Sequence, residues 1–185
     1  MIFNVSNITK KYGKNLVISN FSYSFKSGLY LLTGVNGVGK STLLKLIARV
    51  IYPSNLNFKI DRLKVAYLCE KMELSNVSVY SFLKSISILN KVNVDIKELI
   101  KKWKIPKRNI VNLSKGNKQK VSILMMVLLN ADIYLFDEPT DALDSDSKML
   151  FLQFIKELVL KEKIVIVSTH DKECFNEVLY EELKL

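Results

Sequence analysis

The sequence predicts an α/β fold with a mainly parallel central sheet, an N-terminal antiparallel β region and a small helical region. Residues 133–136 and 164–168 are continuous apolar runs, as expected of parallel strands that are covered on both faces. Residues 145–161 between them form an amphipathic pattern, so the three segments predict a right-handed strand–helix–strand crossover. Residues 21–25 alternate aromatic side chains with serines, which is the period-two pattern of a half-buried strand.

The remaining segments fit the same fold. Residues 29–33 form a short apolar run ending at a glycine, which indicates a buried strand that leads into a turn. Residues 40–51 carry leucines and isoleucines at helical spacing, and residues 63–68 are typical of another strand. Residues 79–129 are largely helical in pattern, with a break at Pro106. We therefore expect one domain over residues 1–185, with a core region at about 1–69 and 130–185 and a helical subdomain at about 70–129.

Composition limits the class of protein. With 185 residues, of which 49% are hydrophobic, the chain is long enough to bury one substantial core. Cys69 and Cys174 lie far apart without metal or redox spacing, which is typical of thiols in a reducing compartment. No export signal is visible, and the most apolar window, residues 121–129, is far shorter than the ~20 residues of a membrane span. A soluble or peripheral protein is expected.

The formal net charge of +10 is unevenly distributed. Residues 97–120 contain nine basic residues and one acidic residue, Glu98, which gives this stretch a net charge of +8. A lysine-rich, solvated face is the interpretation we favour, and proximity to an anionic membrane comes second. Nucleic acid is not expected as a partner, because the stretch contains Trp103 but no regularly spaced aromatic residues that would stack on bases.

Residues 34–41, Gly-Val-Asn-Gly-Val-Gly-Lys-Ser, match the phosphate-loop pattern G-x-x-x-x-G-K-[ST] between a predicted strand and a predicted helix. Glycines let backbone N–H groups converge on phosphate oxygens, and the helix N-terminus adds partial positive charge. Lys40 is expected to reach the β- and γ-phosphates, and the Ser41 hydroxyl to ligate Mg²⁺. The sequence thus predicts a P-loop NTPase whose nucleotide-binding residues include Gly34, Asn36, Gly37, Gly39, Lys40, Ser41 and Thr42.

Two adjacent carboxylates, Asp137 and Glu138, follow the apolar strand at 133–136. Ligands of open parallel sheets bind at the carboxyl ends of the strands. We expect Asp137 to hold Mg²⁺ through water and Glu138 to polarise the attacking water as a general base. A surface acidic turn before Pro139 is the alternative, and the phosphate loop makes it the weaker one.

The order of these two motifs, the polar turn at 113–120 and His170 resembles the nucleotide-binding domain of ATP-binding cassette (ABC) proteins over nearly the whole chain. The resemblance implies that two ATP molecules are held, with Mg²⁺, in a head-to-tail dimer. Ser114 and Gly116 would then bind the γ-phosphate held by a second subunit, acting in trans. His170, the single histidine, would contact the γ-phosphate, and the implied catalytic residues are Lys40, Glu138 and His170. Tyr12 resembles the aromatic residue that stacks on adenine, although an ordinary core or surface tyrosine remains an alternative.

Three positions depart from the family pattern. Glu70 stands where the family normally has glutamine, and its role as a metal ligand or water-orienting group is a hypothesis. Under this hypothesis Glu70→Gln leaves activity intact or raises it, and complete loss would count against it. Lys115 and Asn117 replace the usual residues of the polar turn, but neither change removes Ser114 or Gly116. We therefore expect hydrolysis.

The resemblance implies a peripheral ATPase subunit at the cytoplasmic face of the cell membrane. A separate integral-membrane subunit would dock near residues 70–85, where apolar residues either form this surface or belong to the helical core. The second ATPase subunit is expected to be an identical chain rather than a different one, and compactness suggests export of a drug or antimicrobial peptide. The alternatives are a soluble ABC ATPase for macromolecular assembly or regulation, and a nucleotide-gated binding module with negligible turnover.

Overall fold

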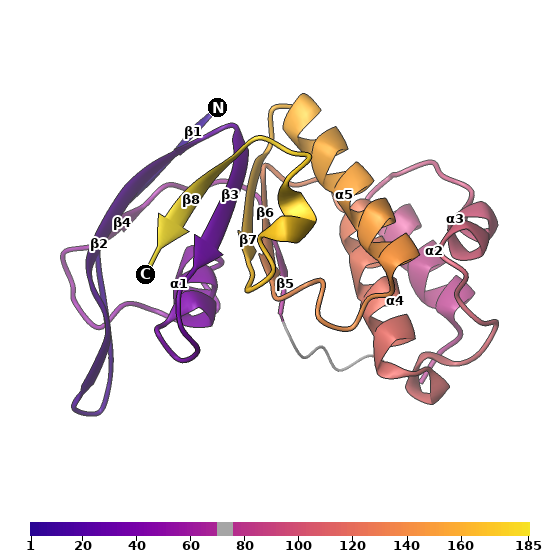
Figure 1. The fold of residues 1–185 in the computed structure, drawn as a ribbon, viewed down its shortest axis with the longest axis horizontal. Coiled ribbons are helices and arrows are strands. Elements are labelled where there is room, and N and C mark those ends of the chain that lie inside the picture. The colour runs from indigo at the N-terminus through magenta and orange to yellow at the C-terminus, as the bar shows by residue number, and fades with distance from the viewer. Residues whose placement is uncertain (70–75) are drawn as a thin grey trace.

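A five-stranded parallel sheet forms the centre of the molecule (Figure 1). The computed structural model describes residues 1–69 and 76–185. The strand order is β5-β6-β7-β3-β8, which places the two strands that precede the predicted motifs, β3 and β6, on either side of β7. The strands are β3 (Gly28–Thr33), β5 (Val65–Leu68), β6 (Ile133–Asp137), β7 (Ile164–Ser168) and β8 (Tyr180–Lys184). Mixed α/β architecture with a parallel core sheet is thereby confirmed.

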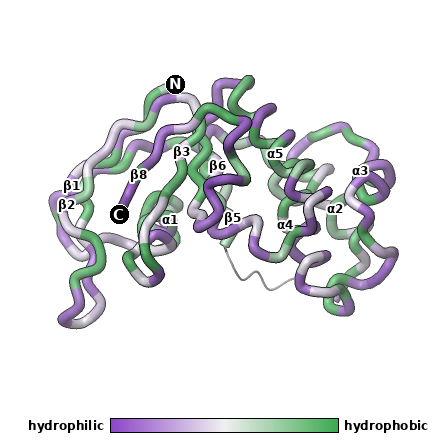
Figure 2. Tube along the Cα trace, in the orientation of Figure 1, coloured by the Kyte–Doolittle hydropathy of each residue, from purple (hydrophilic) through white to green (hydrophobic). Residues whose placement is uncertain are grey.

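Both faces of the sheet are buried, which explains the continuous apolar runs in its strands. Successive residues of β3, β6 and β7 alternate between two hydrophobic clusters. Phe136 and Val165 belong to the cluster on the side of the helical region, whereas Leu135 and Ile166 belong to the cluster shared with α1 (Lys40–Ile47) and the antiparallel strands. In Figure 2, hydrophobic residues colour much of the tube at β3 and β6.

The N-terminal part of the chain forms a second, antiparallel sheet, as predicted. Its order is β2-β1-β4, from β1 (Ile2–Tyr12), β2 (Asn15–Lys26) and β4 (Lys59–Ile60). Phe25 of β2 packs edge-on against Tyr30 of β3, with ring centroids 5.1 Å apart, so the two sheets share one core. Neither β1 nor β8 was expected: register shifts interrupt the alternation of β1, and β8 is a largely exposed edge strand.

Four of the helices begin at side-chain caps that accept a backbone N–H. Ser78 caps α2 (Val79–Leu89), Asp95 caps α3 (Ile96–Lys102), Ser114 caps α4 (Lys115–Val127) and Asp144 caps α5 (Ser145–Leu160). Short 3₁₀ turns lie at Ile110–Asn112 and Glu173–Phe175. The helix expected at 40–51 ends at Ile47, because the backbone turns at Arg49, where φ is 57°. No helix of the described residues is long and apolar enough to span a membrane.

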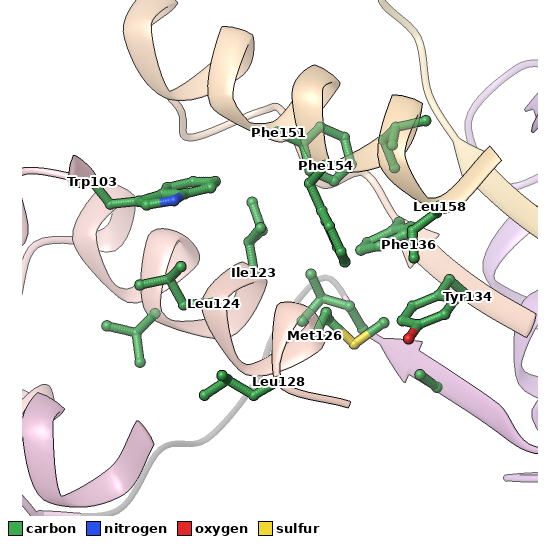
Figure 3. Close-up of a cluster of buried hydrophobic side chains, with 14 of the residues drawn as sticks. Trp103, Ile123, Leu124, Met126, Leu128, Tyr134, Phe136, Phe151, Phe154 and Leu158 are labelled. Atoms are coloured by element: carbon green, nitrogen blue, oxygen red, sulfur yellow. The ribbon is translucent and has the colours of Figure 1, made fainter. Parts of the chain in front are cut away.

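The helical region shares its hydrophobic core with the sheet (Figure 3). Side chains of α4 and the adjoining Trp103 face those of α5 and β6, and the labelled members are Trp103, Ile123, Leu124, Met126, Leu128, Tyr134, Phe136, Phe151, Phe154 and Leu158. The division into a core region at 1–69 and 130–185 and a helical subdomain at 70–129 remains a proposal. One buried cluster contains residues on both sides of the boundary between residues 129 and 130.

Candidate nucleotide site

The phosphate loop borders a cavity of about 440 Å³ at the carboxyl ends of β3, β6 and β7. The cavity brings together side chains from three segments that are far apart in the sequence. Its lining consists of Asn36, Gly37, Gly39, Lys40, Ser41, Thr42, Glu138, Asp141 and His170. All of these except Asp141 are predicted site residues, so the fold gathers most of the expected set in one place.

Two glycines allow the loop its course. Gly37 and Gly39 have φ of 80° and 118°, conformations that L side chains rarely adopt. A Cβ at Gly39 would lie 2.9 Å from Cγ1 and 3.2 Å from the carbonyl oxygen of Val17, so this residue sits directly against β2. A Cβ at Gly37 would meet nothing within 4 Å. The loop is therefore braced on one side and open where it lines the cavity.

Lys40, Glu138 and His170 converge on one point. The Lys40 Nζ lies 3.2 Å from His170 Nε2, 3.8 Å from Glu138 Oε1 and 3.0 Å from the Gly34 carbonyl oxygen, to which it donates a hydrogen bond. His170 Nε2 lies 3.0 Å from the same Oε1, an ion pair only when the imidazole is protonated. When Nε2 accepts from Lys40, it has no proton left for Glu138.

In that arrangement His170 donates no hydrogen bond to Glu138. Both oxygens of the Glu138 carboxylate are buried. Neither of its oxygens has a hydrogen-bond partner among the residues described. Burial raises the pKa of Glu138, and the nearby His170 and Lys40 oppose this shift. Its backbone is also strained, with φ at 46°, and is fixed by the amide donating to the Ser168 Oγ at 3.0 Å. A strained, desolvated carboxylate beside a cavity is suited to accept a proton from water.

Asp137 and Ser41 form a second cluster beside the cavity. The Ser41 Oγ donates to Asp137 Oδ1 at 3.0 Å, and the Ser168 Oγ donates to the same oxygen at 2.7 Å. A hydroxyl and a carboxylate are the protein oxygen donors that hold Mg²⁺ in P-loop NTPases, with water and substrate phosphates completing its shell. The described residues contain no group of three or more His, Cys, Asp or Glu side chains that would hold a metal alone. The donor set therefore fits a cation shared with a phosphate.

Ser114 and Gly116 do not line this cavity. Ser114 caps α4, and its Oγ accepts from the Asn117 amide at 3.3 Å. Gly116 packs so closely that a Cβ would lie 2.6 Å from the carbonyl oxygen of Ala142. Gly116 thus has a packing role within its own chain that the sequence did not reveal.

Two further contacts join α4 to the loop that follows β6. Gln119 Nε2 donates to the carbonyl oxygen of Pro139 at 3.1 Å. The buried Lys120 Nζ pairs with Asp144 Oδ2 at 2.8 Å, and this hydrogen bond holds the pKa of Asp144 well below its usual range. The polar turn at 113–120 and the loop at 138–144, which we call the acidic loop, are therefore fixed to each other.

The remaining predicted residues lie in separate places. Tyr12 does not line the cavity; it is half exposed at the end of β1, with Lys10 Nζ 5.2 Å from its ring centroid. Gly34 has φ of 146°, and a Cβ there would lie 3.0 Å from the carbonyl oxygen of Leu185. Glu70, the departure from the family pattern, lies outside the described residues.

Sequence reasoning missed two residues of the site. Ser168 is fully buried and contacts both Asp137 and the Glu138 amide, and Asp141 lines the cavity. A serine that ends an otherwise apolar buried strand was the available signal for Ser168. Nothing in the local sequence distinguishes Asp141 from its acidic neighbours.

The chain matches known proteins over most of its length. The family model for the ABC transporter matches residues 18–141. The zinc import ATP-binding protein ZnuC of Rickettsia bellii is 34% identical over 92% of this chain and 76% of the relative. The uncharacterized ABC transporter ATP-binding protein YybJ of Bacillus subtilis is 32% identical over 91% of this chain and 85% of the relative.

Solved structures agree with these relatives. A putative ABC transporter ATP-binding protein from Pyrococcus furiosus superposes with a TM-score of 0.79 at 26% identity, covering 99% of this chain and 98% of that one. The RNase-L Inhibitor superposes with a TM-score of 0.81 at 29% identity, covering 96% of this chain but 35% of that one. The P-loop fold and the ATPase activity expected from the sequence are thereby confirmed. This chain belongs to the ABC transporter family, as one of its ATP-binding subunits.

Proposed function

We propose that this subunit hydrolyses ATP at the cavity beside the phosphate loop and thereby drives transport through a membrane-spanning subunit on a separate chain. The observation that carries the proposal is the convergence of Lys40, Glu138 and His170 on that cavity, with the Glu138 oxygens buried and without a hydrogen-bond partner among the described residues. ABC ATP-binding subunits work with a membrane permease subunit. The proposed location is the cytoplasmic face of the membrane.

The chain's own residues would divide the work. The backbone amides from Asn36 to Thr42 surround the phosphates, and Lys40 exchanges its bond to the Gly34 carbonyl for phosphate oxygens. Glu138 accepts a proton from the attacking water, and His170 faces the γ-phosphate. Ser41 and Asp137 would hold Mg²⁺ together with the phosphates, and the bound ion would supply positive charge against the negative charge that develops.

Two copies of the chain are proposed to complete each site. Ser114 and Gly116 lie on α4, away from the cavity of their own subunit, and the α4 N-terminus carries partial positive charge. In the proposed dimer they donate to the γ-phosphate held by the partner, and Tyr12 stacks on adenine. We propose a homodimer, because one chain supplies both halves of the site.

The direction of transport is open to test. Of the relatives described above, the one named for a cargo is a zinc import protein, so the expected export of a drug or antimicrobial peptide gains no support from them. The rival function, a soluble ATPase for macromolecular assembly, draws on the likeness to the RNase-L Inhibitor, of which this chain covers about a third. We favour transport because the transporter relatives match along most of their own length.

Co-purification with ATPase measurement tests the proposal. The tagged chain is recovered from detergent-solubilised membranes of its native cells, and ATP hydrolysis of the complex is compared with that of Glu138→Gln. We expect an integral-membrane protein in the eluate and a loss of hydrolysis of about a hundredfold or more in the variant. A soluble complex without a membrane protein, or equal turnover by the variant, would overturn it.

A further inference from the structure

His170 reaches the nucleotide cavity from the irregular segment at 169–172, which follows β7. Among the residues that the structure describes, the polar partners of its imidazole are Lys40 at 3.2 Å and Glu138 at 3.0 Å. Both of these change partners in the proposed reaction, since Lys40 turns to phosphate oxygens and Glu138 to the attacking water. The orientation of His170 during hydrolysis therefore has to be fixed from its backbone side.

The next residue, Asp171, provides such a fixed point. Its amide donates to Thr169 Oγ1 at 3.0 Å, and its Oδ1 accepts from the Cys174 amide at 3.2 Å. Its Oδ2 accepts from Lys148 Nζ of α5 at 2.9 Å. This last hydrogen bond lowers the pKa of Asp171 and raises the pKa of Lys148, so both groups are charged at neutral pH. Asp171 thus closes the segment on itself and ties it to α5.

Helix α5 is a rigid support for this tie. It begins at the Asp144 cap, and the Lys148 amide donates to the Asp144 carbonyl oxygen at 2.9 Å at the end of the first turn. On the next turn the fully buried Phe151 packs edge-on against Phe175, with ring centroids 6.4 Å apart. Lys148 therefore holds the segment next to His170, whereas Phe175 holds it further along.

Resting on the proposed function, we propose that Lys148 is a positioning residue for His170. By holding Asp171 against α5, it keeps the imidazole directed at the γ-phosphate after Lys40 and Glu138 have changed partners. Displacing a group by about 1 Å from its productive position costs about a hundredfold in rate. Loss of the Lys148 ammonium should therefore slow hydrolysis, while the phosphate loop still binds the nucleotide.

A second ion pair of α5 provides a matched control. Lys156 lies eight residues further along the helix and pairs with Glu177 at 2.8 Å. This pair also joins α5 to the chain that follows β7, but Glu177 is seven residues beyond His170. The Lys148 and Lys156 side chains are 33% and 41% exposed, so removal of either ammonium breaks a partly solvated pair of small energetic value.

ATP hydrolysis by the complete chain compares Lys148→Met with Lys156→Met. For Lys148→Met we expect kcat and kcat/KM to fall together by about tenfold or more, with KM unchanged. Lys156→Met should keep the native constants. Lys148→Arg should restore turnover, because a guanidinium also donates to a carboxylate. The Tm values of the two methionine variants should agree, which excludes unfolding as the cause of the loss.

The single histidine gives an independent, spectroscopic readout. In the untagged chain carrying isotope-labelled histidine, one imidazole NMR signal reports on His170. With Mg²⁺ present, the uncleaved ATP analogue adenylyl imidodiphosphate should place this signal at a different shift from ADP in the native chain and in Lys156→Met. In Lys148→Met the two nucleotides should give the same shift, because the imidazole is no longer held at the γ-phosphate.

The outcomes separate this inference from the proposed function. If His170→Ala or Glu138→Gln hydrolyses ATP as fast as the native chain, the proposed function of the site fails and this inference with it. If both are impaired but Lys148→Met keeps the native kcat and the native NMR shifts, hydrolysis at this site stands and the role of Lys148 is refuted. Equal losses of turnover in Lys148→Met and Lys156→Met would assign both ion pairs to stability and likewise overturn the proposal.

Discussion

Gly116→Ala provides the sharpest test of the contact between the polar turn and the acidic loop. The new Cβ would lie 2.6 Å from the Ala142 carbonyl oxygen, whereas ordinary van der Waals contact begins at 3.4 Å. The two segments must therefore separate by about 0.8 Å, and the obstacle is a backbone atom that has no rotamer to change. Such overpacking costs about 1–3 kcal/mol. Replacing glycine within a helix returns up to about 1 kcal/mol.

The expected net loss is about 1–2 kcal/mol in the free energy of unfolding. In a chain of this size it corresponds to a fall of about 2–8 °C in Tm. The assay is thermal unfolding of the monomer without nucleotide, so that no contribution from a partner's γ-phosphate enters. Lys115→Ala, at the preceding exposed position of the same helix, is the control and should change stability by less than about 0.5 kcal/mol.

A Gly116→Ala variant that melts at or above the native temperature would refute the reasoning. The glycine would then be required only by the second subunit, and the defect would appear only in nucleotide-dependent dimerisation.

Three more predictions follow from the site. Glu138→Gln raises the Tm of the nucleotide-free chain at pH 8 more than at pH 5: the folded-state pKa of Glu138 is raised, so its ionisation opposes folding as pH rises above the unfolded-state value. Asp144→Asn lowers stability slightly at pH 7, and the difference from the native chain begins to shrink as pH falls below about 4 and vanishes only as pH falls through the depressed pKa of Asp144. Because Asp144 is 59% exposed, added salt should shrink this effect. Ser168→Ala removes a donor to Asp137 and an acceptor from the Glu138 amide, and should cost about 1–3 kcal/mol in urea unfolding.

Each of these has a contrary result. A Glu138→Gln chain with unchanged Tm at both pH values would mean that the carboxylate is solvated. An Asp144→Asn difference that does not shrink at all as pH falls from about 4 towards the depressed pKa of Asp144 would assign the effect to packing. An unchanged urea midpoint for Ser168→Ala would show that water replaces both hydrogen bonds.

The sequence predicted what depends on local pattern. The buried strands β6 and β7 have apolar runs because both of their faces are covered, and the phosphate loop carries its own glycines. Edge strand β8 could not be predicted, because its exposed charged residues carry no periodic signal. The left-handed backbone of Glu138 was also out of reach, since it results from the tertiary bond between its amide and Ser168.

In the site, too, features that depend on local pattern could be predicted and features that depend on tertiary contacts could not. Loop residues such as Lys40 and Ser41 were placed from spacing alone, and they line the cavity. The second role of Gly116, and the joining of Lys120 to Asp144, depend on two segments meeting in space. Contacts between segments that are distant in the sequence cannot be predicted from local sequence patterns.

The single apolar cluster that runs from Trp103 through α4 to α5 and β6 limits how this chain can be recombined. If the helical region alone were transplanted from a relative, its buried side chains would no longer be complementary in shape to the side chains around Phe136 and Phe154. Functional chimeras of this subunit must therefore exchange α5 together with the segment that it packs against.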